Sequence, residues 1–274
     1  MTRVLIIGSS HVAAYKNAAE TFAQENPALE LSFFGLRGPL FLGGKIDEAG
    51  VFTVPYRDDA DRALSETVNG QATIDTTAYD HLLMVGHRFA FTHFPLLLEE
   101  HDILEGMRMG RTRLMGEAML RDTIMSVTQA SVDEAAANVA ALNRPVTFAM
   151  APYPATSIVE RAPGFELARL LQEFWGRPDA AWVVDIWLKA LNAALRGHGH
   201  HLLNQPDALN AGPFATKPEF AARAAAMNDA GVLPKTDHRH MNDDFGLAML
   251  RAYAEQLATA TSTTENTTHN ERIA

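Results

Sequence analysis

The chain has 274 residues, of which 47% are hydrophobic and 20% charged, and this is the composition of an ordinary globular protein. It contains no cysteine, which excludes disulfides, thiol catalysis and cysteine-ligated zinc or iron–sulfur sites. The net charge of −10 argues against nucleic acid or an anionic membrane as a main partner. No apolar run is long enough to span a bilayer, and the N-terminal one is too short for a signal peptide. We therefore expect a soluble, cytoplasmic protein.

The first forty residues predict a β-α-β unit. Residues 3–7 form a short apolar run that ends at Gly8, as a buried parallel strand would. Residues 12–24 carry apolar side chains at helical spacing, and residues 29–34 are typical of a second strand. Two sequential parallel strands joined by a helix imply a right-handed crossover.

Further strands and helices alternate along the rest of the chain. Strands are predicted at residues 51–55, 81–85, 146–151 and 201–204, and helices within 101–142 and at 167–175 and 180–195. A glycine-rich loop at 35–44 follows the second strand, and Asn242 has the residue type of an N-cap for the last helix. We predict one α/β domain over residues 1–258, with a parallel sheet of about five strands, and a disordered tail at 259–274.

Two short segments from opposite ends of the chain carry residues suited to nucleophilic catalysis. Ser10 lies between the first strand and the first helix, at the edge of the sheet where ligands bind in open α/β proteins. Its hydroxyl and the neighbouring backbone N–H groups are then available to a substrate. Asp237 stands three residues before His240, a spacing that lets the carboxylate hold the imidazole Nδ1 and leaves Nε2 to accept the serine proton.

These residues resemble the SGNH, or GDSL-type, hydrolase superfamily: a serine after the first strand, a glycine loop after the second, Gly86 after the third, and D-x-x-H-x-N before the last helix. The resemblance covers most of the chain. It implies a flavodoxin-like three-layer α/β/α sandwich and a serine esterase or O-acyltransferase, acting on a small-molecule ester such as an acylated saccharide. It also implies that Ser10 is the nucleophile, His240 the general base and Asp237 the residue that orients it.

The oxyanion hole departs from the family pattern. The resemblance implies the backbone N–H groups of Ser10 and Gly38 as donors, but the family's G-x-N-D motif is here Gly86-His87-Arg88-Phe89. Loss of the asparagine donor typically lowers turnover by about 10²–10³. Arg88 and His87 are candidates to replace it. The charge of Arg88 would also suit an anionic group of the substrate.

Several alternatives stay open. A serine at a strand–helix turn is most often a simple N-cap, and the missing asparagine allows a non-catalytic protein that binds a saccharide or nucleotide sugar on the same scaffold. Arg88 would have no chemical role if it formed an ion pair with Asp80, Glu99 or Glu100. The histidines of residues 198–201, or His238 and His240, could suggest a metal site, but the sequence has no H-E-x-x-H pattern and a zinc site usually needs three converging ligands. We expect no cofactor and no metal ion.

Overall fold

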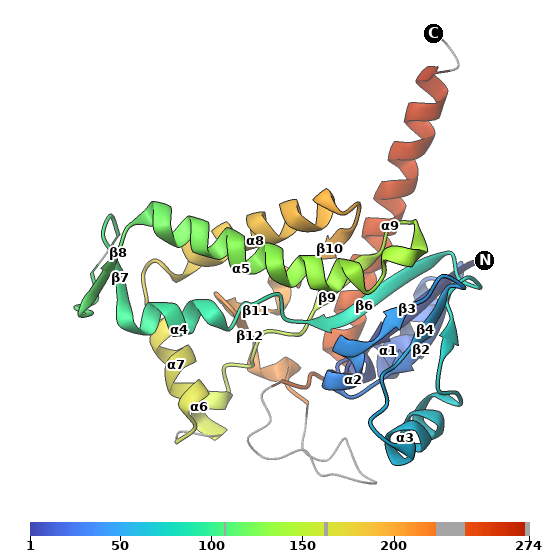
Figure 1. The fold of residues 1–274 in the computed structure, drawn as a ribbon, viewed down its shortest axis with the longest axis horizontal. Coiled ribbons are helices and arrows are strands. Elements are labelled where there is room, and N and C mark those ends of the chain that lie inside the picture. The colour runs from blue at the N-terminus through green and yellow to red at the C-terminus, as the bar shows by residue number, and fades with distance from the viewer. Residues whose placement is uncertain (107, 162–163, 223–238, 272–274) are drawn as a thin grey trace.

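The computed structural model describes residues 1–106, 108–161, 164–222 and 239–271 (Figure 1). Its main sheet has five parallel strands in the order β10–β9–β6–β1–β2. Their bounds are β1 Thr2–Gly8, β2 Leu29–Gly35, β6 His81–His87, β9 Thr147–Met150 and β10 His201–Leu203. From the β2 edge, these strands follow the 2-1-3-4-5 order of the flavodoxin-like fold. The predicted fold class is confirmed.

Side chains alternate between the two faces of this sheet, so β1 contributes to two hydrophobic cores. Val4 and Ile6 pack with α1 (Val12–Glu25) and α9 (Asp243–Glu271) on one face. Leu5 and Ile7 pack on the other face with α5 (Glu117–Ala137) and α8 (Ala180–Gly197), which lie side by side in Figure 1. Because helices cover both faces, the strand is apolar without interruption, which is the reason its alternation is invisible in the sequence.

Shorter elements surround the three layers. The other helices are α2 Gly38–Gly43, α3 Asp59–Asn69, α4 His93–Glu100, α6 Ile158–Arg161 and α7 Glu166–Trp175, with 3₁₀ turns at Ala140–Leu142, Asp207–Leu209 and Pro218–Phe220. Strands β3 Lys45–Ile46, β4 Val51–Thr53 and β5 Ile74–Asp75 form an antiparallel sheet. Two pairs remain, β7 His101–Ile103 with β8 Arg113–Met115, and β11 Asn210–Gly212 with β12 Ala215–Thr216.

The prediction of helix at residues 101–115 is wrong, because the strands β7 and β8 lie there. Gly110 has a φ of 83°, a conformation that a helix does not contain. Its N–H and that of Arg111 donate to the Asp102 carboxylate, at 2.8 and 2.9 Å, and so turn the chain back on itself. The predicted glycine loop also differs, since part of it forms α2.

Helix α9 begins as predicted but ends later. The Asn242 Oδ1 accepts the N–H of Phe245 at 3.1 Å, which confirms the N-cap. The helix runs to Glu271, whereas the sequence predicted a disordered tail from residue 259. Residues 258–271 contain neither glycine nor proline, so nothing in them ends a helix, and their polar composition alone is not a stop signal. The single-domain boundary stays a prediction.

A close approach between α1 and α9 joins the two ends of the chain. A Cβ atom added at Gly246 would lie 2.0 Å from the carbonyl oxygen of Ala14, so the two helices touch there through their backbones. The turn before α1 and the segment before α9 are consequently neighbours. None of the helices in the described part of the chain is both long and apolar enough to cross a membrane.

Candidate active site

The turns after β1 and β6 lie next to each other, at the point where the order of the sheet reverses. Gly8 pairs with Val85, and a Cβ atom at Gly8 would lie 2.2 Å from the Val85 carbonyl oxygen. Gly86 has a φ of 115°, and a Cβ atom there would lie 2.2 Å from Ser9 Oγ. Glycine is required at both positions because any side chain would push the two turns apart. Ligands of open α/β sheets bind in this crevice.

Ser10 and His240 form a hydrogen bond across this edge. Ser10 is exposed on the turn before α1, and its Oγ lies 2.8 Å from His240 Nε2. The His240 ring lies beside the His11 ring, with 5.5 Å between their centroids. This is the contact that a nucleophile and its general base require. Asp237, the predicted orienting residue, lies outside the described residues.

The backbone around His240 is fixed on both sides. Its carbonyl oxygen accepts the N–H of Ala222 at 2.9 Å, and Ala221 forms an antiparallel bridge with Met241. The Asn242 N–H donates to the Phe220 carbonyl at 2.9 Å. The segment that carries the histidine is therefore held against residues 220–222 by backbone hydrogen bonds.

A cavity of about 680 Å³ opens at the serine, and its wall includes Ser10, Gly38 and His240. The backbone N–H groups of Ser10 and Gly38 donate to no acceptor within the described residues. Backbone donors that are unused and line the same cavity as a nucleophile are what an oxyanion hole needs. The assignment of these two groups as donors stays a prediction.

His87 lies in the aromatic core beneath the cavity. Its ring centroid is 4.8 Å from that of Phe41, 5.3 Å from Phe89 and 5.4 Å from Phe148. Burial lowers the pKa of His87 to about 4, so the ring is neutral at pH 7. A neutral, enclosed imidazole brings no positive charge to a developing oxyanion.

Arg88 is exposed at the cavity, on a turn that is held in an unusual conformation. The next two residues, Phe89 and Ala90, have φ values of 43° and 63°, which cost of order 1–3 kcal/mol each. Trp187 Nε1 fixes the turn by donating to the Phe89 carbonyl at 3.0 Å. Partial burial and the positive charge of Arg239 both lower the pKa of Arg88. Two guanidinium groups therefore line this cavity together.

The three acids considered as partners of Arg88 are engaged elsewhere, so that interpretation is wrong. Glu99 pairs with Arg169, and Glu100 pairs with Arg113. The Asp80 carboxylate accepts the backbone N–H of Arg3 at 2.7 Å. Arg88 forms no ion pair with any carboxylate of the described residues. Sequence analysis missed Arg239, although its place beside His240 was visible, because nothing in the sequence showed that it lies close to Arg88.

The histidines near residue 200 have roles within the fold. His198 Nε2 lies 2.7 Å from the Asp133 carboxylate, and His200 Nδ1 accepts the N–H of Val146 at 3.4 Å. Within the described residues, no group of three or more potential ligands has the arrangement of a metal site.

Comparisons with known proteins give only distant matches. No protein-family model matches the chain, and no curated protein matches it. Among solved structures, it is similar to the periplasmic domain of a lipopolysaccharide acetyltransferase from Salmonella ser. Paratyphi A, with a TM-score of 0.39, 12% identity and coverage of 93% of this chain and 83% of that one. It is also similar to an extracellular lipase from Streptomyces rimosus, with a TM-score of 0.40, 12% identity and coverage of 92% and 99%. At these TM-scores and identities, neither match assigns the chain to a family.

Proposed function

We propose that this protein is a serine acyl hydrolase of the SGNH type that acts on a small acyl ester. The observation that carries the proposal is the 2.8 Å hydrogen bond between Ser10 Oγ and His240 Nε2. It lies at the reversal point of the sheet, beside two backbone donors that find no acceptor in the described part of the chain. A serine that served only as a helix N-cap would bond to backbone N–H groups, and this one bonds to an imidazole.

The chemistry follows from this geometry. Ser10 Oγ attacks the acyl carbonyl while His240 Nε2 takes its proton, and the N–H groups of Ser10 and Gly38 stabilise the tetrahedral oxyanion. The imidazolium then returns the proton to the leaving alcohol oxygen as the C–O bond breaks, which leaves an acyl group on the serine. Water, deprotonated by the same imidazole, releases the carboxylic acid. Asp237 would hold the imidazole in the tautomer that these steps require.

O-Acyl transfer is a second candidate function. The cavity of about 680 Å³ beside His240 has room for an alcohol where hydrolysis needs only water. An acceptor hydroxyl that bound there would receive the acyl group through the same residues. An acylated saccharide, which the family resemblance implies, would fit either reaction.

Labelling with a fluorophosphonate tests the proposal, because this probe reacts with activated serines. We expect one adduct, located on Ser10 by mass spectrometry, that is lost in Ser10→Ala and strongly slowed in His240→Gln. Ser131→Ala is the matched control, since Ser131 lines the same cavity and has no assigned role. If the folded protein is not labelled, or if labelling survives Ser10→Ala, the non-catalytic binding protein becomes the better interpretation.

A further inference from the structure

A second cavity meets the first at the serine. Its volume is about 420 Å³, and Ser9, Ser10 and Gly38 belong to the walls of both. It runs between α1 and α3, over the end of β2. Its wall includes six large apolar side chains, those of Val12, Phe33, Leu36, Leu40, Leu64 and Val68. We refer to it as the α1–α3 groove, and to the first as the His240 cavity.

Two large apolar side chains in the wall of the groove are exposed to solvent. Leu64 and Val68 lie one turn apart on α3 with exposures of 40% and 52%. Both line the groove. The polar Asp61 at its wall is neutralised by Arg57, at 2.7 Å, and by Arg37, at 3.4 Å. The groove therefore offers an open apolar surface that ends at the nucleophile.

The position of His240 decides which part of an ester enters which cavity. His240 lines the first cavity and is absent from the walls of the groove. The imidazole that takes the serine proton must also deliver it to the leaving alcohol oxygen, so the alcohol has to lie on the side of His240. The acyl chain then extends to the opposite side of the serine, into the groove.

The two sides also differ in how their charged groups are paired: the wall of the groove has Lys16, Arg37 and Asp61, and Arg37 pairs with Asp61 at 3.4 Å. Arg88 and Arg239 line the His240 cavity, together with His93 and one carboxylate, that of Glu134. Arg88 has no ion-pair partner among the described residues, although the chain has an excess of acids. An anion on the alcohol would find a guanidinium there, and charge-assisted hydrogen bonds of this kind are about twice as strong as neutral ones.

We infer that the substrate is an ester between a linear aliphatic acid and an alcohol that carries an anionic group, with the chain in the α1–α3 groove and the anion on Arg88. The inference rests on the serine acyl hydrolase proposed above. In the reaction, the bond between the acyl carbon and the alcohol oxygen breaks and a bond to Ser10 Oγ forms. Water then replaces the serine, so that the products are the fatty acid and the anionic alcohol.

Esters of 3-hydroxy-4-nitrobenzoate test the acyl side, because the released phenol is coloured. Along the series acetyl, butanoyl and hexanoyl, kcat/KM should rise by up to about fourfold per buried methylene. In Leu64→Gln/Val68→Gln, the ratio of kcat/KM for the hexanoyl ester to that for the acetyl ester should fall about tenfold. Leu96→Gln is the control, since Leu96 is an exposed leucine outside both cavities. Equal loss on both esters, or no dependence on chain length, would overturn the groove assignment.

The methyl ester of the same nitrobenzoate removes the negative charge and tests the alcohol side. Arg88→Gln should lower kcat/KM about tenfold on the carboxylate and little on the methyl ester, and Arg88→Lys should keep part of the activity. The difference in kcat/KM between the wild type and Arg88→Gln on the carboxylate should shrink as salt is added, because salt screens the attraction between the two charges. Arg196→Gln, which removes an exposed cation outside both cavities, should change neither. An equal fall of kcat on both esters would assign Arg88 to the oxyanion instead.

The inference and the proposed function fail in different ways. If Ser10 is labelled and the esters are cleaved without selectivity for chain or charge, the substrate assignment is wrong and the hydrolase stands. If Ser10 is not labelled and no ester is cleaved, both fall together.

Discussion

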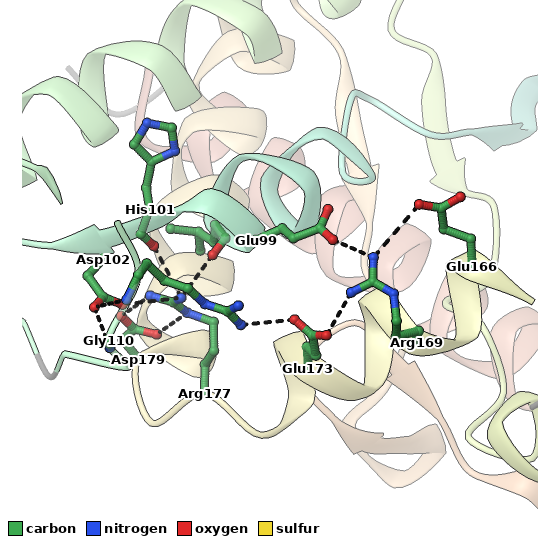
Figure 2. A network of polar contacts seen from close by, with 11 residues as sticks. Glu99, His101, Asp102, Gly110, Glu166, Arg169, Glu173, Arg177 and Asp179 are labelled. Carbon is green, nitrogen blue, oxygen red and sulfur yellow. Dashed lines mark hydrogen bonds and ion pairs between the residues drawn. The ribbon is translucent and has the colours of Figure 1, made fainter. Parts of the chain in front are cut away.

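The arginines near α7 and Arg88 at the His240 cavity have opposite surroundings. Arg169 contacts the carboxylates of Glu99, Glu166 and Glu173 (Figure 2). Glu173 also accepts from Arg111 at 2.9 Å. These contacts join α4 to α7. Arg177 is only 2% exposed, pairs with Asp179 at 2.9 Å and donates to the carbonyls of Leu98 and His101. Arg88, by contrast, has no carboxylate partner among the described residues.

This difference is informative because the chain has 33 acidic residues against 23 basic ones. Acids are plentiful, and two of the candidates considered from the sequence, Glu99 and Glu100, pair with other arginines. The network around α7 is complete without a ligand and stabilises the fold. At Arg88, by contrast, the described residues provide no carboxylate, and we propose that an anionic group of the substrate takes that place.

At the cavity, the largest expected effect concerns the residue that would orient the base. Asp237→Asn should favour the wrong imidazole tautomer and lower kcat by about 10⁴, as in the serine-protease template. The thermal midpoint should change little. Steady-state kinetics on the acetyl ester and a melting curve would measure both. If activity is nearly unchanged in Asp237→Asn and in Asp237→Ala, Asp237 is a turn residue and another group holds His240.

At α7, the expected effect is on stability. Arg177→Ala removes one partner of a buried ion pair and two hydrogen bonds to backbone carbonyls, which should lower the free energy of unfolding by about 3–5 kcal/mol. Changing the exposed Arg169 to alanine should lower the free energy of unfolding much less than Arg177→Ala does, because surface ion pairs contribute little. Urea titrations measure these differences, and kcat of the folded variants should stay at the wild-type value. A kinetic defect in Arg177→Ala with normal stability would contradict the division between the two regions.

The buried His87 predicts a dependence of stability on pH. Its pKa of about 4 in the folded state lies below the ordinary value of 6.5, so the unfolded chain binds a proton between these values that the folded chain does not. The free energy of unfolding should therefore fall by about 3 kcal/mol, from this group alone, as pH drops from 7 to 4. In His87→Phe this contribution disappears, and denaturant titrations at several pH values would show the difference. If the free energy of unfolding depends on pH in the same way in the wild type and in His87→Phe, protonation of His87 does not destabilise the folded state.

The smallest expected effect comes from a substitution at the contact between α1 and α9, which supports the position of His240. Gly246→Ala places a methyl group against the Ala14 carbonyl oxygen and should cost about 1–3 kcal/mol, which exceeds the gain in helix propensity. Because α9 carries the segment with His240, kcat/KM should fall as well. Gly197→Ala is the control, since a Cβ atom at Gly197 has no neighbour within 4 Å. A more stable and fully active Gly246→Ala would show that the helices can separate without moving the site.

The sequence by itself determined the fold class, the strand–serine–helix opening and the N-cap at Asn242. These features depend on residues that are near neighbours in the chain: the period of apolar side chains, and the turn chemistry of glycine, proline and asparagine. It also placed Ser10 and His240 as candidates. The same local signals misled at residues 101–115, where the Asp102 carboxylate turns the chain, and at 259–271, where polar residues continue a helix.

Only the tertiary structure decided how distant groups meet. The hydrogen bond between Ser10 and His240 spans 230 residues and depends on the approach of α9 to α1 at Gly246. The α1–α3 groove exists because Leu64 and Val68 face the end of β2. Within the described residues Arg88 has no carboxylate partner, and Glu99 and Glu100 pair with other arginines. The choice among ion-pair partners, and the shape of a cavity between two elements, depend on contacts that no periodic pattern in the sequence encodes.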